Sequence, residues 1–362
     1  MENKILNKSL QNEIKRPVQI WLLLGVVMVF FQVVIGGVTR LTDSGLSITE
    51  WAVIQGTLPP MNNVEWEQAF DLYKAAAKKQ YEALHADMTL SEFKFIYFWE
   101  YFHRLWARTM GFVFLIPFLY FLAKKWMPKW LLQRLGIVIL LAGLAAVFGW
   151  IMVASGLNND NRTWVSAYKL VIHLGIATTL LGYLFWTWLR AVQPMTEDGH
   201  LSNLKKLGWL IAGVLFVQII FGGLMAGMRA GLIHPYISVF VEGGHFWSAL
   251  TATGVDQMVD YEPNTFPKAL VQLLHRGTAW ILTGLIIFFL IKTKKAMISK
   301  RLQTGAMALF VMLIIQVLLG IYTVINSIGK TPIFLGVIHQ AGALVLLICL
   351  LFVNFQFKKN RK

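Results

Sequence analysis

Eight apolar segments constrain the fold of this chain more than any other feature of its sequence. A helix needs roughly 20 apolar residues to cross a bilayer, whereas the strands of a membrane β-barrel alternate apolar with polar residues. Charged residues make up only 14% of the chain, against about a quarter in ordinary soluble domains. We therefore predict an all-α polytopic membrane protein with eight transmembrane helices. They cover about residues 18–38, 97–122, 131–153, 167–190, 207–227, 269–291, 305–326 and 334–355.

The formal net charge of +15 has two candidate explanations, nucleic-acid binding or the charge asymmetry of membrane loops. Most of the 33 lysines and arginines fall at the two chain ends and in short segments near 124–134, 190–206 and 292–301. Cytoplasmic loops of membrane proteins are enriched in these residues. We therefore expect both termini in the cytoplasm and a lipid bilayer around the chain, with no nucleic-acid partner.

The cysteine count and the N-terminal residues bear on the compartment. The chain has one cysteine, Cys349, so no disulfide forms within it. Its first 17 residues contain Glu2 and Glu13 and show no cleavage site, unlike a secretory signal or a transit peptide. We expect a multi-pass protein of a bacterial cell inner membrane.

The second half of the chain repeats the first. The matching residues are Gln32 with Gln218, Gly36-Gly37 with Gly222-Gly223, His103-Arg104 with His275-Arg276, Gly149 with Gly320, and His173 with His339. Each half has four apolar segments, so both halves enter the membrane in the same orientation. We predict two pseudo-symmetric parallel four-helix bundles, residues 1–190 and 207–362, joined by a cytoplasmic linker, 191–206. The first half includes a long outer loop, about 40–95, in which Glu65 to His85 is expected to form one amphipathic helix.

Four histidines stand at similar depth in the second and fourth predicted helices of each half: His103, His173, His275 and His339. Two parallel helices can point their imidazoles at one iron, as bis-histidine ligation of a haem requires. A single membrane histidine more often forms a hydrogen bond between helices, but four in a repeat favour a functional site. Zinc is a weaker alternative because no cysteine or carboxylate cluster completes its ligand set. We predict two haems near the outer face.

The neighbours of the histidines fit this interpretation. One turn after each histidine stands an alanine, which would let a flat macrocycle lie against the helix. Arginines follow two of the histidines and can bind haem propionates, although snorkelling to the interface is the alternative. The candidate haem-binding residues are Arg104, Arg276, Ala107, Ala177, Ala279 and Ala343.

The two halves differ three residues before the first histidine of each. Glu100 precedes His103, whereas the neutral Gln272 precedes His275. Position i−3 shares the helix face of the histidine, so a carboxylate there can act as a base or stabilise positive charge at a reacting carbon. An ion pair with Arg104 or Lys169 is the alternative. We expect the first haem to be the one that reacts and the second to transfer electrons.

These residues resemble the haem A synthase family, in the form shared by mitochondria and many proteobacteria. The resemblance implies an oxidoreductase acting on a CH or CH2 group, which converts haem O to haem A for terminal oxidases. The C8 methyl group would become a formyl group by successive hydroxylations. The matching stretches are GGVTRLTDSGLSITEW, LPP at 58–60, MTLSEFKFIYFWEYFHRLWAR, GWIMVASGL, GLMAGMRAG, NTFP at 264–267, LLHRGTAW and GVIHQ.

The resemblance also implies roles for single residues. His103 and His173 would bind the iron of the substrate haem O, with Glu100 catalytic. The cofactor haem b would be bound through its iron by His275 and His339. Haem O synthase and oxidase assembly factors are the expected protein partners, and a homo-oligomer is left open.

The chain departs from the family pattern at two places. It lacks the outer-loop cysteine pair that some members carry, because its only cysteine is Cys349. A glutamine common in the third helix of the family is Ala145 here.

Two other functions account for part of the sequence. A dihaem b electron-transfer cytochrome of the quinol-oxidising type would explain the four histidines, but not why only one half carries Glu100. A transporter would explain the repeat, but it predicts matched interruptions of the helices at the membrane midplane, and none is evident.

Overall fold

The computed structural model describes residues 14–49, 58–157, 163–193, 196–236, 243–251, 264–296 and 298–358. In these ranges all the regular structure is helical, and eight helices are long and apolar enough to cross a membrane. All eight predicted segments are thereby confirmed. Residues 1–13 and 359–362, on which the expected position of the termini depends, lie outside the described residues. The eight helices are α2 (Arg16–Leu41), α5 (Leu90–Ala123), α6 (Lys129–Leu157), α7 (Ala167–Val192), α8 (Ser202–Gly227), α10 (Thr265–Lys295), α11 (Lys300–Ile325) and α12 (Ile333–Gln356).

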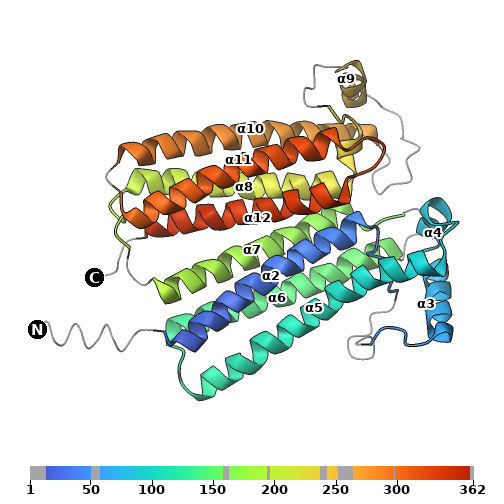
Figure 1. Cartoon of the computed structure of the whole chain (residues 1–362), viewed down its shortest axis with the longest axis horizontal. Helices are drawn as coiled ribbons and strands as arrows, with labels where there is room; N and C mark the ends of the chain where they lie inside the picture. The colour runs from blue at the N-terminus through green and yellow to red at the C-terminus, as the bar shows by residue number, and fades with distance from the viewer. Residues whose placement is uncertain are drawn as a thin grey trace, which may run out of the picture.

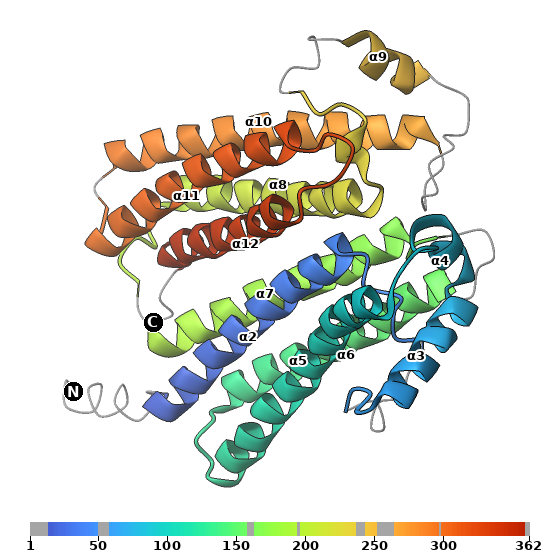
Figure 2. The ribbon, with the colours of Figure 1, turned by 45° about the vertical axis from the view of Figure 1, so that its right-hand side comes forward.

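Four helices form the middle of the bundle (Figure 1). Helices α2, α7, α8 and α12 pack against one another there. Helix α5 packs on α2 and α6 on α7 at one side, and α10 packs on α8 and α11 on α12 at the other (Figure 2). Helices α5, α7, α10 and α12 all begin at the end of the bundle that carries the short helices, which we call the cap end.

Glycines allow the central helices to approach closely. A Cβ atom added at Gly37 of α2 would lie 2.5 Å from the side-chain oxygen of Gln340 in α12. One added at Gly223 of α8 would lie 2.9 Å from the side chain of Val171 in α7. Small residues at such contacts are the usual basis of helix association in membranes, where lipid is as apolar as the helices. These glycines therefore determine how the first four spanning helices contact the last four.

The peripheral helices expose large apolar side chains. Phe112 of α5, Leu140 of α6 and Trp280 of α10 are 64%, 60% and 66% exposed. Apolar patches of this extent are rare on water-soluble monomers. Because these side chains lie on helices of spanning length, their surroundings are lipid.

The described part of the long loop forms a small helical cap, residues 63–89. Its helices are α3 (Asn63–Ala76) and α4 (Lys78–Leu84), so the predicted single helix from Glu65 to His85 is wrong: it is broken at Ala77. Phe70 and Tyr73 are buried, and their rings pack 4.8 and 5.5 Å from that of Phe93 near the start of α5. The cap is therefore fixed to the helix that carries His103. The other short helices are η2 (Ala230–Leu232) and α9 (Gly243–Thr251).

Candidate functional site

The four predicted ligand histidines lie on the four helices that begin at the cap end, and each is half-buried. His275 and His339 come together, with ring centroids 6.4 Å apart and ring planes at 83°. His103 and His173 lie on α5 and α7, which both pack on α2. The structure thus brings the rings of one predicted pair, His275 and His339, together, and places the other pair on two helices that share a neighbour.

The spacing of His275 and His339 fits an iron between two imidazoles. A metal–nitrogen bond is about 2 Å long, so two imidazoles on opposite sides of one metal have ring centres roughly 6 Å apart. The observed 6.4 Å agrees with this distance. Within the described residues, no three His, Cys, Asp or Glu side chains gather as a metal site. Two imidazoles without further protein ligands suit a haem, whose porphyrin supplies the other donors, better than zinc.

Each imidazole faces a glycine on the preceding spanning helix. A Cβ atom added at any of these glycines would lie 3.0–3.4 Å from an atom of the ring, which is closer than ordinary van der Waals contact or at its lower limit. Side chains are therefore excluded beside all four rings. The pairs are Gly36 with His103, Gly149 with His173, Gly222 with His275, and Gly320 with His339.

A glutamine one turn before the glycine contacts three of the four rings. The side-chain nitrogen lies 2.9–3.1 Å from a ring nitrogen and 3.0–3.2 Å from the backbone oxygen of the same histidine. Gln32 and Gln218 belong to the repeat predicted from the sequence. Gln316 was not predicted, although its spacing to Gly320 repeats that of Gln32 to Gly36. The pairs are Gln32 with His103, Gln218 with His275, and Gln316 with His339.

The fourth ring has a different partner. Ala145 stands where the pattern has glutamine, and its backbone oxygen lies 2.9 Å from Nδ1 of His173. A carbonyl oxygen only accepts hydrogen bonds, so Nδ1 carries the proton and Nε2 keeps its lone pair. A metal-binding histidine commonly donates its second ring nitrogen to a backbone carbonyl in this way.

Glu100 is 3% exposed and has several partners. One carboxylate oxygen accepts hydrogen bonds from the Ser47 hydroxyl and the Ile48 amide, both at 2.8 Å. The other forms an ion pair with Arg104 at 2.5 Å. The ion pair considered as the alternative role of Glu100 is therefore present, and the carboxylate also binds the segment that follows α2. No feature of the sequence indicated Ser47 or Ile48 as its partners.

The two arginines predicted to meet propionates donate to backbone carbonyls. Arg104 donates to the carbonyl of Ile48 at 2.9 Å. Arg276 donates to the carbonyls of His234 and Tyr236 at 2.6 and 2.8 Å. Each arginine therefore fixes the segment that follows the first helix of its half. A guanidinium has five N–H donors, so these contacts leave room for others.

Gln272 has contacts like those of its neighbour Arg276. It is fully buried and donates to the carbonyl of His234 at 3.0 Å. Glu100 and Gln272 thus both bind the segment after the preceding helix, one with a charged group and one with a neutral group.

The four alanines have different surroundings. Ala107 is exposed, whereas Ala177 and Ala343 are partly buried against the apolar core. Ala279 is half-buried, and its carbonyl accepts from the Thr283 hydroxyl at 2.8 Å. Their role as a surface for the macrocycle stays a prediction.

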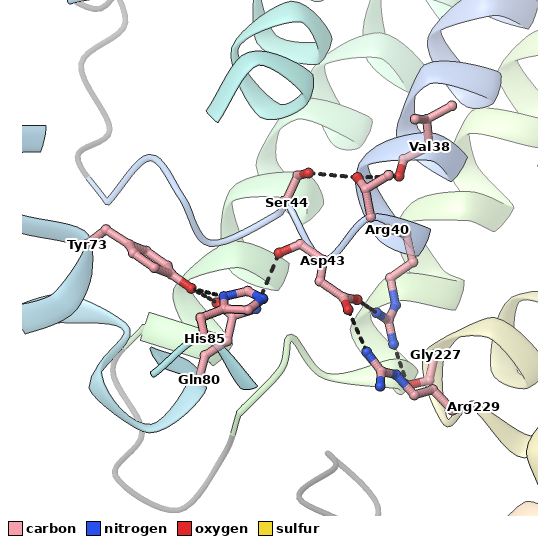
Figure 3. Close-up of polar contacts among 10 residues, drawn as sticks. Val38, Arg40, Asp43, Ser44, Tyr73, Gln80, His85, Gly227 and Arg229 are labelled. Carbon is pink, nitrogen blue, oxygen red and sulfur yellow. Dashed lines mark hydrogen bonds and ion pairs between the residues drawn. The ribbon is translucent and has the colours of Figure 1, made fainter. Parts of the chain in front are cut away.

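An ion-pair network joins the ends of α2 and α8 (Figure 3). The carboxylate of Asp43 lies 2.8 Å from Arg229 and 3.6 Å from Arg40, and Arg40 donates to the carbonyl of Gly227 at 3.0 Å. Both guanidinium groups also lie over the Trp164 ring, at 5.0 and 4.4 Å. This network, which was not predictable from the sequence, fixes the contact between the halves at the cap end.

The cap reaches the same network through neutral polar contacts (Figure 3). The Tyr73 hydroxyl lies 2.6 Å from Nδ1 of His85 and donates to Gln80, which donates to the backbone oxygen of Asp43. Burial lowers the pKa of His85 below its ordinary value of 6.5. Burial also raises the pKa of Tyr73. Both groups are therefore neutral near pH 7, where they can share a hydrogen bond.

Comparison with known proteins gives consistent matches along the chain. A family model described as COX15-CtaA, cytochrome oxidase assembly protein, matches residues 19–351. A protein named "Heme A synthase" in Flavobacterium psychrophilum is 38% identical over 344 residues, which cover 95% of this chain and 99% of that protein. Proteins of the same name in Nitrosospira multiformis and Parvibaculum lavamentivorans are 37% and 39% identical. The first match covers 96% of this chain and 95% of the Nitrosospira protein, and the second covers 90% of this chain and 90% of the Parvibaculum protein.

Proposed function

Because this chain belongs to the COX15-CtaA family of cytochrome oxidase assembly proteins, we propose that its two histidine pairs bind two haems with different tasks. The chain is a haem A synthase, a membrane-embedded oxidoreductase that converts haem O to haem A. This activity agrees with the enzyme expected from the sequence rather than with the electron-transfer cytochrome or the transporter.

The C-terminal pair would bind the cofactor, haem b. The 6.4 Å between the rings of His275 and His339 supports this assignment, because it suits one iron with two imidazole ligands. Haem b supplies one-electron transfer when bound. Gln272, the neighbour one turn before His275, is neutral and gives this site no buried base.

The N-terminal pair would bind the iron of the substrate, haem O, with Glu100 as the catalytic residue. The observation that carries this proposal is that Glu100 is buried three residues before His103, where the other half has Gln272. Conversion of a methyl to a formyl group by successive hydroxylations releases protons from the reacting carbon. A carboxylate on the face of His103 can accept such a proton or stabilise positive charge there.

Arg104 and the 47–48 segment orient this carboxylate. Arg104 places a positive charge 2.5 Å from one oxygen, and two donors at 2.8 Å bind the other. Arg104 and Arg276 would also bind propionates with the donors that the loop carbonyls leave, and the four alanines would face the macrocycles.

The distribution of basic residues indicates how the enzyme is oriented in the membrane, and its substrate and product indicate its protein partners. Lysine and arginine gather at the end of the bundle opposite the cap end. They are Lys124 and Lys125 after α5, Arg190 near the end of α7, Lys205 and Lys206 near the start of α8, Lys292, Lys294 and Lys295 at the end of α10, and Lys300 and Arg301 at the start of α11. The positive-inside rule then assigns this end to the cytoplasm of a bacterial inner membrane and both haem sites to the outer half. Haem O synthase as the donor of the substrate and oxidase assembly factors as recipients of haem A are the proposed protein partners.

The test of the catalytic assignment is Glu100→Gln in the full-length protein, co-expressed with a source of haem O. We expect the haem absorption spectrum to persist and haem A to disappear from the extracted haems, as measured by mass spectrometry. Ser47→Ala is the matched control, because it removes one hydrogen bond to the carboxylate but keeps the carboxylate. Formyl production that survives in Glu100→Gln would refute the proposed role.

The cofactor assignment has its own test. His275→Ala should lose the stable haem b signal while the protein still inserts into the membrane. His103→Ala should retain that signal. An unchanged spectrum in His275→Ala would overturn the assignment of haem b to the C-terminal pair.

A further inference from the structure

One position breaks a pattern that the other three histidine contacts share. The helix that precedes each histidine helix places a residue one turn before the glycine that faces the ring. This residue is glutamine in α2, α8 and α11, and it is Ala145 in α6. Ala145 belongs to the half that must release its haem as product in each cycle, if the proposed function is right.

We propose that Gln218 and Gln316 are positioning residues that retain haem b, and that Ala145, where the family commonly has glutamine, loosens His173 so that this chain releases haem from its N-terminal site faster than a glutamine there would allow. The proposal rests on the assignment of substrate and cofactor given above. It concerns residues that do not touch the iron and act through the histidines.

Each glutamine constrains its histidine in two ways. Gln316 contacts Nδ1 of the His339 ring at 3.1 Å and donates to the His339 backbone oxygen at 3.0 Å. The amide therefore fixes both the rotation of the His339 ring and the position of His339 along α11. Ala145 has no side chain with which to reach His173, and only its backbone oxygen contacts that ring.

Gln316 also has a side-chain oxygen that can accept a hydrogen bond. This oxygen is buried and accepts no hydrogen bond from the described residues, whereas the side-chain oxygen of Gln218 accepts from the Thr278 hydroxyl. An imidazole that binds a metal through Nε2 carries its proton on Nδ1 and needs an acceptor there. Because the two ends of an amide are nearly isosteric, a turn of the Gln316 amide presents its oxygen to Nδ1, in exchange for the donation to the His339 backbone oxygen. Iron binding would thus satisfy an acceptor that is otherwise unsatisfied, which strengthens retention.

The experiment measures the release of haem b from the full-length protein in lipid nanodiscs, loaded at both sites without any haem O source. Transfer to excess apomyoglobin, followed by absorbance, should show a fast phase from the N-terminal site and a slow phase from the C-terminal site. Gln316→Ala should accelerate the slow phase at least tenfold and change the low-spin electron paramagnetic resonance signal. Ala145→Gln should slow the fast phase. Gln303→Ala, an exposed glutamine of the same helix, should change neither phase.

A conservative variant separates positioning from folding. Gln316→Glu keeps an acceptor for Nδ1, so it should retain the slow phase and lower the midpoint potential of haem b. An unchanged slow phase in Gln316→Ala, an unchanged fast phase in Ala145→Gln, or an unchanged potential in Gln316→Glu would each overturn the proposal. Loss of the slow phase in His103→Ala rather than in His275→Ala would instead refute the assignment of the two sites.

Discussion

The substitution Gly149→Ala tests whether the glycine beside an imidazole is required for haem binding. The new Cβ atom would lie 3.1 Å from Cε1 of His173, whereas ordinary contact begins at 3.4 Å. The ring must therefore retreat by at least about 0.3 Å, and its hydrogen bond to Ala145, now 2.9 Å, must lengthen or turn. Functional groups must be held to within about 0.5 Å, so this retreat uses more than half of the tolerance of the ligand.

The expected loss of haem affinity in Gly149→Ala follows from the packing around His173. Overpacking of a filled site costs about 1–3 kcal/mol, which corresponds to roughly 5- to 150-fold weaker haem binding. Alanine is also favoured over glycine within a helix by about 1 kcal/mol. We therefore expect Gly149→Ala to lose haem affinity without a matching loss of thermal stability.

The control lies in the same helix. A Cβ atom at Gly143 would meet nothing within 4 Å, so Gly143→Ala gains the helix propensity without the clash. The assay is titration of each purified variant with haem O in nanodiscs, together with haem A production and thermal unfolding. Equal haem affinity in the two variants would refute the reasoning, because the contact with His173 would then have no energetic effect.

Two further predictions concern the cap end. Arg229→Ala should cost about 1 kcal/mol or less of stability, because the Arg229 and Asp43 side chains are 25% and 26% exposed and solvent weakens the pair. A double-mutant cycle with Asp43→Ala, measured by thermal unfolding, should show a coupling energy, and additive effects would contradict the pair. Because burial lowers the pKa of His85, the unfolded cap binds a proton more readily than the folded cap, so the cap loses stability as the pH falls below about 6.5. Asp43 and Glu92 oppose this shift, Arg229 adds to it, and the Tyr73 hydroxyl contacts the ring. The hydrogen-exchange protection of residues 63–93, corrected for the intrinsic exchange rate at each pH, should fall between pH 7.5 and 5.5 in the native protein. It should fall less in His85→Gln, and an equal fall in both would exclude His85 as the cause.

Much of the site could be predicted because its signals are local. Each histidine stands inside a segment of strong helical character, and the spacing from His103 to Glu100 places both on one helix face. Gln316 could have been found as well, because its spacing to Gly320 repeats that of Gln32 to Gly36. That signal was overlooked rather than absent.

Other contacts could not be predicted from any local pattern in the sequence. Glu100 and Ser47 are 53 residues apart, and Arg229 and Asp43 are 186 residues apart. Nothing in the composition near Glu100 indicates that its carboxylate binds the segment after α2. The break of the cap helix at Ala77 was also missed, because the apolar face of α3 and α4 continues across it.

The sequence alone determined the class of the protein, its eight spanning helices and the four histidines. In a bilayer each helix must satisfy its own backbone hydrogen bonds, so the length and hydropathy of a segment are sufficient to predict it. Only the tertiary structure decided which groups surround each imidazole, which partners bind Glu100, and how Asp43 connects the two halves. These contacts join distant residues through side-chain packing, and their geometry exists only once the helices have come together.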